Sequence, residues 1–152
     1  MDVVGSDVPR LNQAEVRSTT LICQIDHFVR HPHGLFGFGW ALDHEHKIVQ
    51  SHLNMLFADG RVERVAVSLG RVREDVASAF PDNDQAGNSG FMVIAGWGGE
   101  PPEKVELVFE MQDAVTGRHE LALSALDTAS GAEVAESIYL AKRAWAYLRR
   151  GN

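Results

Sequence analysis

The sequence predicts a mainly β fold, an antiparallel immunoglobulin-like β-sandwich with a C-terminal α-helix. Three observations predict it. Six or seven short apolar segments are separated by turn residues, several of them alternate apolar and polar side chains, and a helical pattern follows at the end of the chain. At 152 residues, the chain has a common length for one domain with its own core.

The predicted organisation has three parts. Residues 1–17 have no sustained periodicity and form a flexible or edge-lying lead-in. Residues 18–128 form the β-sandwich domain. Residues 129–152 form the C-terminal helix and a linker.

The first two strands are predicted at 19–28 and 35–42. The first is rich in β-branched and apolar residues, and the turn between the two contains Pro32 and Gly34. Together they form the start of an antiparallel sheet.

The strand at 35–42 alternates aromatic residues with glycines. One face carries Phe36, Phe38 and Trp40, which predicts that Trp40 has a structural role and is buried between the two sheets. The other face carries Gly37 and Gly39, and glycines inside a strand predict a bulge or a close approach of another backbone.

A β-hairpin is predicted around Asp59-Gly60. Strands at 47–57 and 62–67 flank this dipeptide, which is typical of a type I′ turn.

The segment at 71–80 has a different pattern. Asp75 is predicted to be the N-cap of a short helical turn, which Pro81 ends. Arg73 is predicted to fasten the same segment to nearby carbonyls or carboxylates, because its guanidinium offers five donors. Both residues therefore have a predicted structural role.

Three further strands are predicted at 90–97, 104–111 and 118–125. Their alternation places Leu107, Phe109 and Leu123 in the core.

A C-terminal helix is predicted from a capping-box spacing and an apolar stripe. Ser130 and Glu133 have the capping-box spacing. The stripe consists of Val134, Ile138, Ala141, Trp145 and Leu148. The stripe packs on the sandwich or, because other helix positions are also apolar, contacts a downstream domain or a partner chain, including a second copy in a homodimer.

Composition restricts the function classes. The chain has 14 Lys and Arg against 21 Asp and Glu, a net charge of −7, which argues against a nucleic-acid binder and against attachment to anionic lipid. Cys23 is the only cysteine, so neither an internal disulfide nor a cysteine zinc site can form. The sequence has no signal-peptide pattern and no stretch long enough to span a bilayer, and we expect a cytoplasmic location.

Two histidine pairs are the candidates for a metal site. The pairs are His31-x-His33 and His44-x-His46. Both fall in predicted turns and neither belongs to a spaced ligand motif, so we expect solvated histidines and no metal or other cofactor. An enzyme with a metal held by these four histidines remains the alternative.

No catalytic constellation is visible in the sequence. There is no GxSxG motif, and the glycine-rich stretch around Trp97 precedes no GK[ST] sequence. Trp97 is the candidate ligand-binding residue, because a ring beside a glycine-rich turn can stack on a sugar. Core packing is the alternative for Trp97.

An ordered set of short motifs runs through residues 35–95. The motifs are Gly39-Trp40-Ala41-Leu42-Asp43, Asp59-Gly60, Arg73-x-Asp75-Val76, Phe80-Pro81 and Ser89-Gly90-Phe91. Followed by a basic helix, this set resembles the immunoglobulin-like accessory module attached to bacterial glycosyltransferases of surface polysaccharide synthesis. The turn at 43–46 lacks the proline or glycine expected there, and nothing resembles a transferase core.

The resemblance implies a non-catalytic module that serves a polysaccharide-related glycosyltransferase, by scaffolding or by weak glycan contact. The implied partners are a transferase domain or chain and a glycan. The alternatives are an interaction or dimerisation domain that acts through its C-terminal helix, and the histidine-metal enzyme. An exposed Trp97 favours glycan contact, and converging histidine pairs favour the enzyme.

Overall fold

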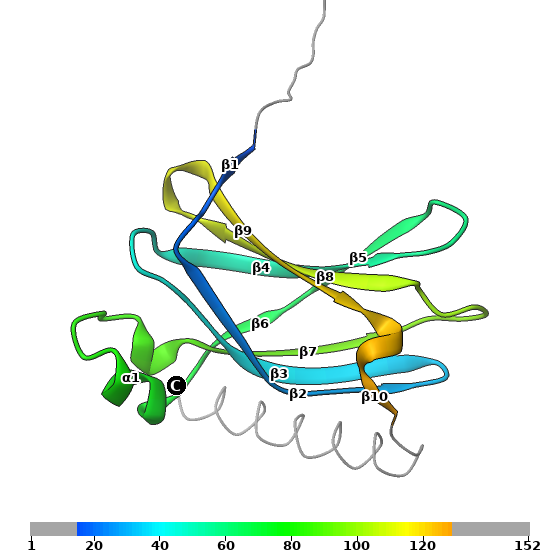
Figure 1. Cartoon of the computed structure of the whole chain (residues 1–152), viewed down its shortest axis with the longest axis horizontal. Coiled ribbons are helices and arrows are strands. Elements are labelled where there is room, and N and C mark those ends of the chain that lie inside the picture. The colour runs from blue at the N-terminus through cyan, green and yellow to red at the C-terminus, as the bar shows by residue number, and fades with distance from the viewer. Residues whose placement is uncertain (1–14, 129–152) are drawn as a thin grey trace, which may run out of the picture.

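The computed structural model describes residues 15–128, which form two five-stranded sheets stacked face to face (Figure 1). The strands are β1 Val16–Arg17, β2 Leu21–His31, β3 Gly34–Asp43, β4 Ile48–Leu56, β5 Val62–Ala66, β6 Ser68–Arg71, β7 Gly90–Gly96, β8 Lys104–Met111, β9 Val115–Ala122 and β10 Asp127–Thr128. The helical segments are α1 Glu74–Ala79, η2 Ala86–Asn88, η3 Gln112–Ala114 and η4 Leu123–Ala125. The fold is therefore mainly β, as predicted.

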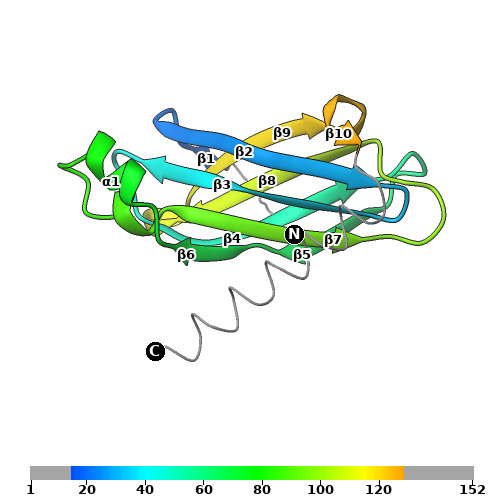
Figure 2. The same cartoon turned by 90° about the horizontal axis from the view of Figure 1, so that it is seen from below.

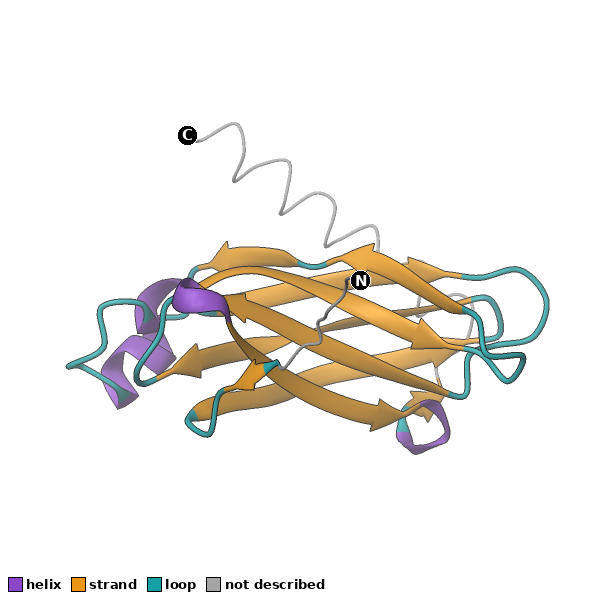
Figure 3. Ribbon diagram, turned by 90° about the horizontal axis from the view of Figure 1, so that it is seen from above, coloured by secondary structure: helices purple, strands orange, loops and turns teal. Residues whose placement is uncertain are grey.

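The first sheet has the strand order β1-β9-β8-β4-β5, and the second has the order β10-β2-β3-β7-β6. Pairing is antiparallel except at two edges, where β1 lies parallel to β9 and β10 lies parallel to β2. The hairpins β2–β3, β4–β5 and β8–β9 each stay within one sheet. The connections therefore gather at the two ends of the sandwich, where the helical segments also lie (Figure 3).

The ends of the chain bear on two predictions. Val16–Arg17, at the end of the predicted lead-in, form the edge strand β1. The rest of the lead-in before residue 15 and the predicted C-terminal helix lie outside the described residues. Within residues 15–128, no helix combines the length and apolar character that crossing a membrane requires.

The core lies between the two sheets. Its fully buried side chains include Leu53 from β4, Phe91 from β7 and Val105 from β8. The rings of Phe91 and Phe109, one from each sheet, meet edge to face with centroids 5.7 Å apart. The predicted burial of Leu107, Phe109 and Leu123 is confirmed.

The orientation of β3 is opposite to the one predicted. Leu35 and Ala41 belong to the core between the sheets, whereas Trp40 is half-buried on the outer face of the second sheet. The reason is the space beside Gly37, which the Phe28 ring fills: a Cβ at Gly37 would lie 1.7 Å from Phe28 Cδ1. The glycine face is thus the core face, because a neighbouring strand supplies the aromatic side chain.

The Asp59-Gly60 hairpin is confirmed, but its turn differs from the predicted type. Gly60 has a φ of 90°, and Asp59 does not have a positive φ. The Gly60 N–H donates to the Phe57 carbonyl at 3.0 Å, and the Phe57 N–H donates to the Arg61 carbonyl at 2.9 Å. This geometry is that of a three-residue hairpin loop, in which a type I turn is followed by a glycine in the left-handed conformation.

Two consecutive residues with positive φ, as in a type I′ turn, occur instead in the turn between β8 and β9. Asp113 and Ala114 have φ values of 63° and 59°, and the Val115 N–H donates to the Gln112 carbonyl. A type I′ turn needs this geometry at its two central residues. The sequence did not predict it, because alanine is disfavoured at a positive φ.

Ala114→Gly is expected to stabilise the protein. Glycine adopts this left-handed conformation without the Cβ clash, and the relief of about 1–2 kcal/mol exceeds the greater chain entropy that glycine loses on folding. We expect a net gain of about 0.5–1 kcal/mol in the free energy of unfolding, measured by urea denaturation. The control is Gly98→Ala, which makes the reverse change at a residue with open space around it and no positive φ. It should be close to neutral. A loss of stability in Ala114→Gly would contradict the strain argument.

Candidate functional site

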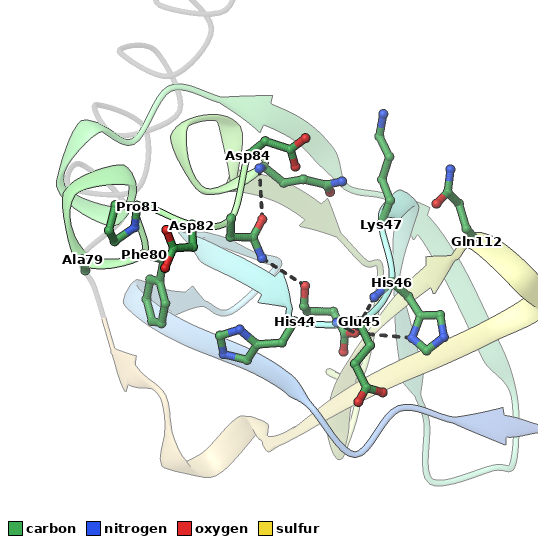
Figure 4. Close-up of a pocket in the computed structure, with 13 residues that line it drawn as sticks. His44, Glu45, His46, Lys47, Ala79, Phe80, Pro81, Asp82, Asp84 and Gln112 are labelled. Atoms are coloured by element: carbon green, nitrogen blue, oxygen red, sulfur yellow. Dashed lines mark hydrogen bonds and ion pairs between the residues drawn. The ribbon is translucent and has the colours of Figure 1, made fainter.

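A groove at one end of the sandwich is the candidate site. Three connections meet there, β3–β4, β6–β7 and β8–β9, although they are far apart in the sequence (Figure 4). The hollow between them has a volume of about 640 Å³. Its lining consists of Asp43, His44, Glu45, His46, Lys47, Ala79, Phe80, Pro81, Asp82, Asn83, Asp84, Gln85 and Gln112.

Asp43, the last residue of β3, organises the first wall of the groove. Its carboxylate is fully buried. It accepts hydrogen bonds from the hydroxyls of Ser18 and Thr20, the latter at 3.1 Å, and from the backbone N–H groups of Glu45 at 3.0 Å and His46 at 2.9 Å. This pattern fixes the turn of the β3–β4 connection, which explains why the turn at 43–46 needs neither proline nor glycine.

The charge of Asp43 is stabilised despite its burial. Burial alone raises the pKa of a carboxyl, but the hydrogen bonds from Ser18, from the two backbone N–H groups and from Thr20 together outweigh it. The pKa of Asp43 is therefore lower than its ordinary value. The residue is a structural anion at neutral pH.

The second wall comes from the β6–β7 connection. The Asn83 side chain joins the two walls, because its Nδ2 donates to the Asp43 carbonyl at 3.2 Å and its Oδ1 accepts from the Gln85 N–H at 3.0 Å. The carboxylates of Asp82 and Asp84 lie on the exposed rim (Figure 4). The groove thus offers both carboxylate and amide groups to a ligand.

An aromatic ring contributes to the same wall. The Phe80 ring lies between His44 and Trp40, with centroid distances of 5.7 Å and 5.8 Å. Trp40 and Phe80 also pack on a small apolar cluster that includes Leu42 and Val76. Trp40 therefore supports the groove from below instead of filling the core between the sheets.

Arg73 and Asp75 tie this end of the fold together in a way that differs in part from the prediction. The N-cap of α1 is Arg73, and no side chain caps the helix. The Asp75 carboxylate accepts hydrogen bonds from Arg73 Nε at 2.9 Å and Nη2 at 2.7 Å, so the predicted cap to the backbone is not formed. Arg73 Nη1 also donates to Asp26 on β2 at 2.6 Å, which attaches the start of α1 to the second sheet. Arg73 accordingly lowers the pKa of Asp75.

Trp97 lies at the opposite end of the sandwich from the groove. Its side chain is buried, with 8% exposed, and its indole N–H donates to the Pro32 carbonyl at 2.8 Å. The exposed ring that a sugar platform requires is not observed, since the ring packs into the core and its polar atom is already bonded.

The two histidine pairs do not converge. His31 and His33 flank the β2–β3 turn, whereas His44 and His46 follow β3 at its other end, about 33 Å away for a strand of this length. Across the described part of the chain, no three His, Cys, Asp or Glu residues lie close enough to hold a metal ion together. The arrangement that favours the histidine-metal enzyme is therefore absent there.

Sequence reasoning did not predict the groove. Its polar loop was visible as the run from Asp82 to Gln85, and its other wall as the His44-x-His46 turn. Nothing in a single sequence says that these segments meet, because their contact depends on how the two sheets stack. No protein-family model, no curated protein and no solved structure matches this chain.

Proposed function

We propose that the chain is a non-catalytic, immunoglobulin-like module that serves a polysaccharide-related glycosyltransferase and contacts a glycan weakly through the groove. The transferase is a domain of the same protein or a partner chain, and the proposed location is the cytoplasm. The ordered motif set supports the transferase context. The meeting of two of these motifs at the groove supports the glycan contact.

The strand order supports the immunoglobulin-like assignment. The order β2-β3-β7-β6 corresponds to strands A-B-E-D, and the order β9-β8-β4-β5 corresponds to G-F-C-C′. In this correspondence the groove lies between the B–C and F–G connections. Variable immunoglobulin domains use these two connections for binding.

The position of the motif residues is the observation that carries the proposal. Trp40 and Asp43 come from one motif and Phe80 from another, and the two segments meet at the groove. Asp43 and Phe80 line the groove and Trp40 packs on Phe80, so these two motifs help to build one surface. The polar groups on that surface suit a ligand with many hydroxyls, because carboxylates accept hydrogen bonds from hydroxyls and side-chain amides both accept and donate them.

The size and openness of the surface suit weak binding. The groove is a shallow hollow at the end of the sandwich and encloses no apolar cavity, so it buries little of a ligand. Phe80, a half-buried aromatic residue in the lining of the groove, takes the role that the sequence suggested for Trp97.

The double variant Asp82→Ala/Asp84→Ala is expected to weaken glycan binding at least about tenfold. Each lost hydrogen bond to a charged group costs about 1.5–3 kcal/mol, and 1.4 kcal/mol corresponds to a factor of ten. Binding is measured by NMR titration with a panel of oligosaccharides from bacterial surface polysaccharides.

The control for this experiment is Asp59→Ala/Glu63→Ala, which removes two exposed acids from the β4–β5 hairpin at the other end of the sandwich. It has the same change in net charge and should bind like the wild type. An equal loss of affinity in both double variants would show a general charge effect and contradict the groove as the site.

A further inference from the structure

The outer face of the second sheet is apolar. We call the outer apolar face the surface formed by Val29, Phe36, Phe38, Met92 and Ile94. These side chains are neighbours on three strands, because Phe36 pairs with both Val29 and Ile94, and Phe38 pairs with Met92. The Phe36 and Phe38 rings lie 5.9 Å apart.

The outer apolar face is separate from the core. The alternate residues of the same strands, Phe28, Leu35, Phe91 and Val93, point between the sheets. The outer face of the first sheet, in contrast, carries charged side chains, as expected of a surface in water. There Arg118 donates to Glu106 at 2.7 Å and to a second carboxylate.

Three side chains of the outer apolar face are nevertheless shielded from solvent. Phe36 is 4% exposed, and Val29 and Met92 are each 7% exposed. Side chains of a single sheet shield one another along their flanks, but their ends stay accessible unless another layer covers them. Figure 2 shows β2, β3 and β7 side by side with no described element across them. The His27 ring beside Phe36 and the Arg71 guanidinium on Met92 belong to the same sheet, so we take the layer over Phe36 and Val29 to come from outside residues 15–128.

The path of the chain points to the occupant. The described part ends at β10, where Asp127 pairs with Val29 at the edge of the outer apolar face. The 24 residues at 129–152 follow directly. A helix over 134–150 is about 25 Å long, and β3 is about 33 Å long, so such a helix fits along the sheet with 129–133 left to reverse the chain.

The chemistry of this segment matches the face. Its predicted helix has an apolar stripe formed by Val134, Ile138, Ala141, Trp145 and Leu148. We infer that residues 129–152 of the same chain fold back and cover the outer apolar face with this stripe as a third layer. A segment attached at the edge of the face has an effective concentration near millimolar, which a second copy of the chain does not reach in dilute solution.

Crosslinking in the full-length chain tests this inference. In a Cys23→Ser background, Phe38→Cys is combined with Ile138→Cys or with Ala141→Cys, and a short bismaleimide is added at low protein concentration. Phe38 is suitable because 37% of it is exposed. We expect an intrachain crosslink in the monomer, identified by peptide mass spectrometry. The control combines Gln50→Cys, on the outer face of the first sheet, with Ile138→Cys and should not crosslink.

Three outcomes would overturn the inference. Crosslinks between two chains would show that a second copy covers the face. Equal crosslinking in the Gln50 control would show a segment without a fixed place, and no crosslink in either Phe38 pair would show that the segment lies elsewhere.

A second measurement does not depend on crosslinking. Ile138→Asp is expected to raise the fluorescence of a hydrophobic dye severalfold and to keep the β-sheet circular dichroism, because the stripe leaves the outer apolar face. Ala146→Asp adds the same charge on the side of the predicted helix away from the stripe and should match the wild type. Unchanged dye fluorescence in folded Ile138→Asp would contradict the inference.

Discussion

Asp43→Ala is expected to lower the free energy of unfolding by about 3–5 kcal/mol, a large part of the roughly 5–15 kcal/mol of a typical domain. The carboxylate is buried and is the common acceptor for Ser18, Thr20 and two backbone N–H groups. Removing it leaves several donors without a partner, and each unsatisfied buried group costs about 1–3 kcal/mol. Urea unfolding followed by tryptophan fluorescence measures the loss.

Asp59→Ala is the matched control for this variant. The Asp59 carboxylate likewise accepts a hydrogen bond from a backbone N–H group in its turn, that of Arg61 at 2.9 Å. Asp59 is exposed, however, and makes one such bond. Water can replace the carboxylate there, so we expect a loss below about 1 kcal/mol. Similar losses in the two variants would show that burial of Asp43 does not matter.

The same carboxylate predicts a pH dependence. Its pKa in the folded protein is lower than that of an unfolded Asp, about 3.9, so folding favours the ionised form. The stability that Asp43 contributes is therefore fully present above about pH 5 and is lost as the pH falls through its folded pKa. Asp43→Asn should show a weaker fall in stability between about pH 5 and pH 2 than the wild type, measured by urea unfolding. An unchanged fall would contradict the lowered pKa.

Gly39→Ala is expected to destabilise the protein by about 3 kcal/mol or more, because strain from overpacking cannot relax there. A Cβ at Gly39 would lie 2.1 Å from the Gln24 carbonyl oxygen, a backbone atom held in the β2–β3 pairing next to a bulge. Any relief must displace β2 and disturb its hydrogen bonds. Thermal unfolding followed by circular dichroism measures the effect.

Two other glycine variants serve as comparisons for Gly39→Ala. Gly37→Ala meets the Phe28 ring at 1.7 Å and must move a core side chain, so it should also be strongly destabilising. Gly98→Ala meets nothing within 4 Å and should be close to neutral. If Gly39→Ala and Gly98→Ala have the same melting temperature, β2 and β3 do not approach each other closely at Gly39.

The sequence predicted the features that depend on neighbouring residues. The strand at Lys104–Met111 was predicted with its observed bounds, because its apolar residues alternate with polar ones and turn residues flank it. The hairpin at Asp59-Gly60 was predicted because glycine there permits a positive φ. The close approach at Gly39 was likewise readable, since a strand glycine indicates missing space.

Only the tertiary structure decided which face of β3 points inward and where the site lies. The local pattern of Phe36, Phe38 and Trp40 favoured an aromatic core, but the space opposite Gly37 belongs to Phe28, nine residues earlier and on another strand. The groove depends on longer contacts still, such as the bond from Asn83 to the Asp43 carbonyl. A sequence determines the alternation of a strand, whereas the stacking of sheets determines which of its two faces loses water, and that depends on side chains that are distant in the chain.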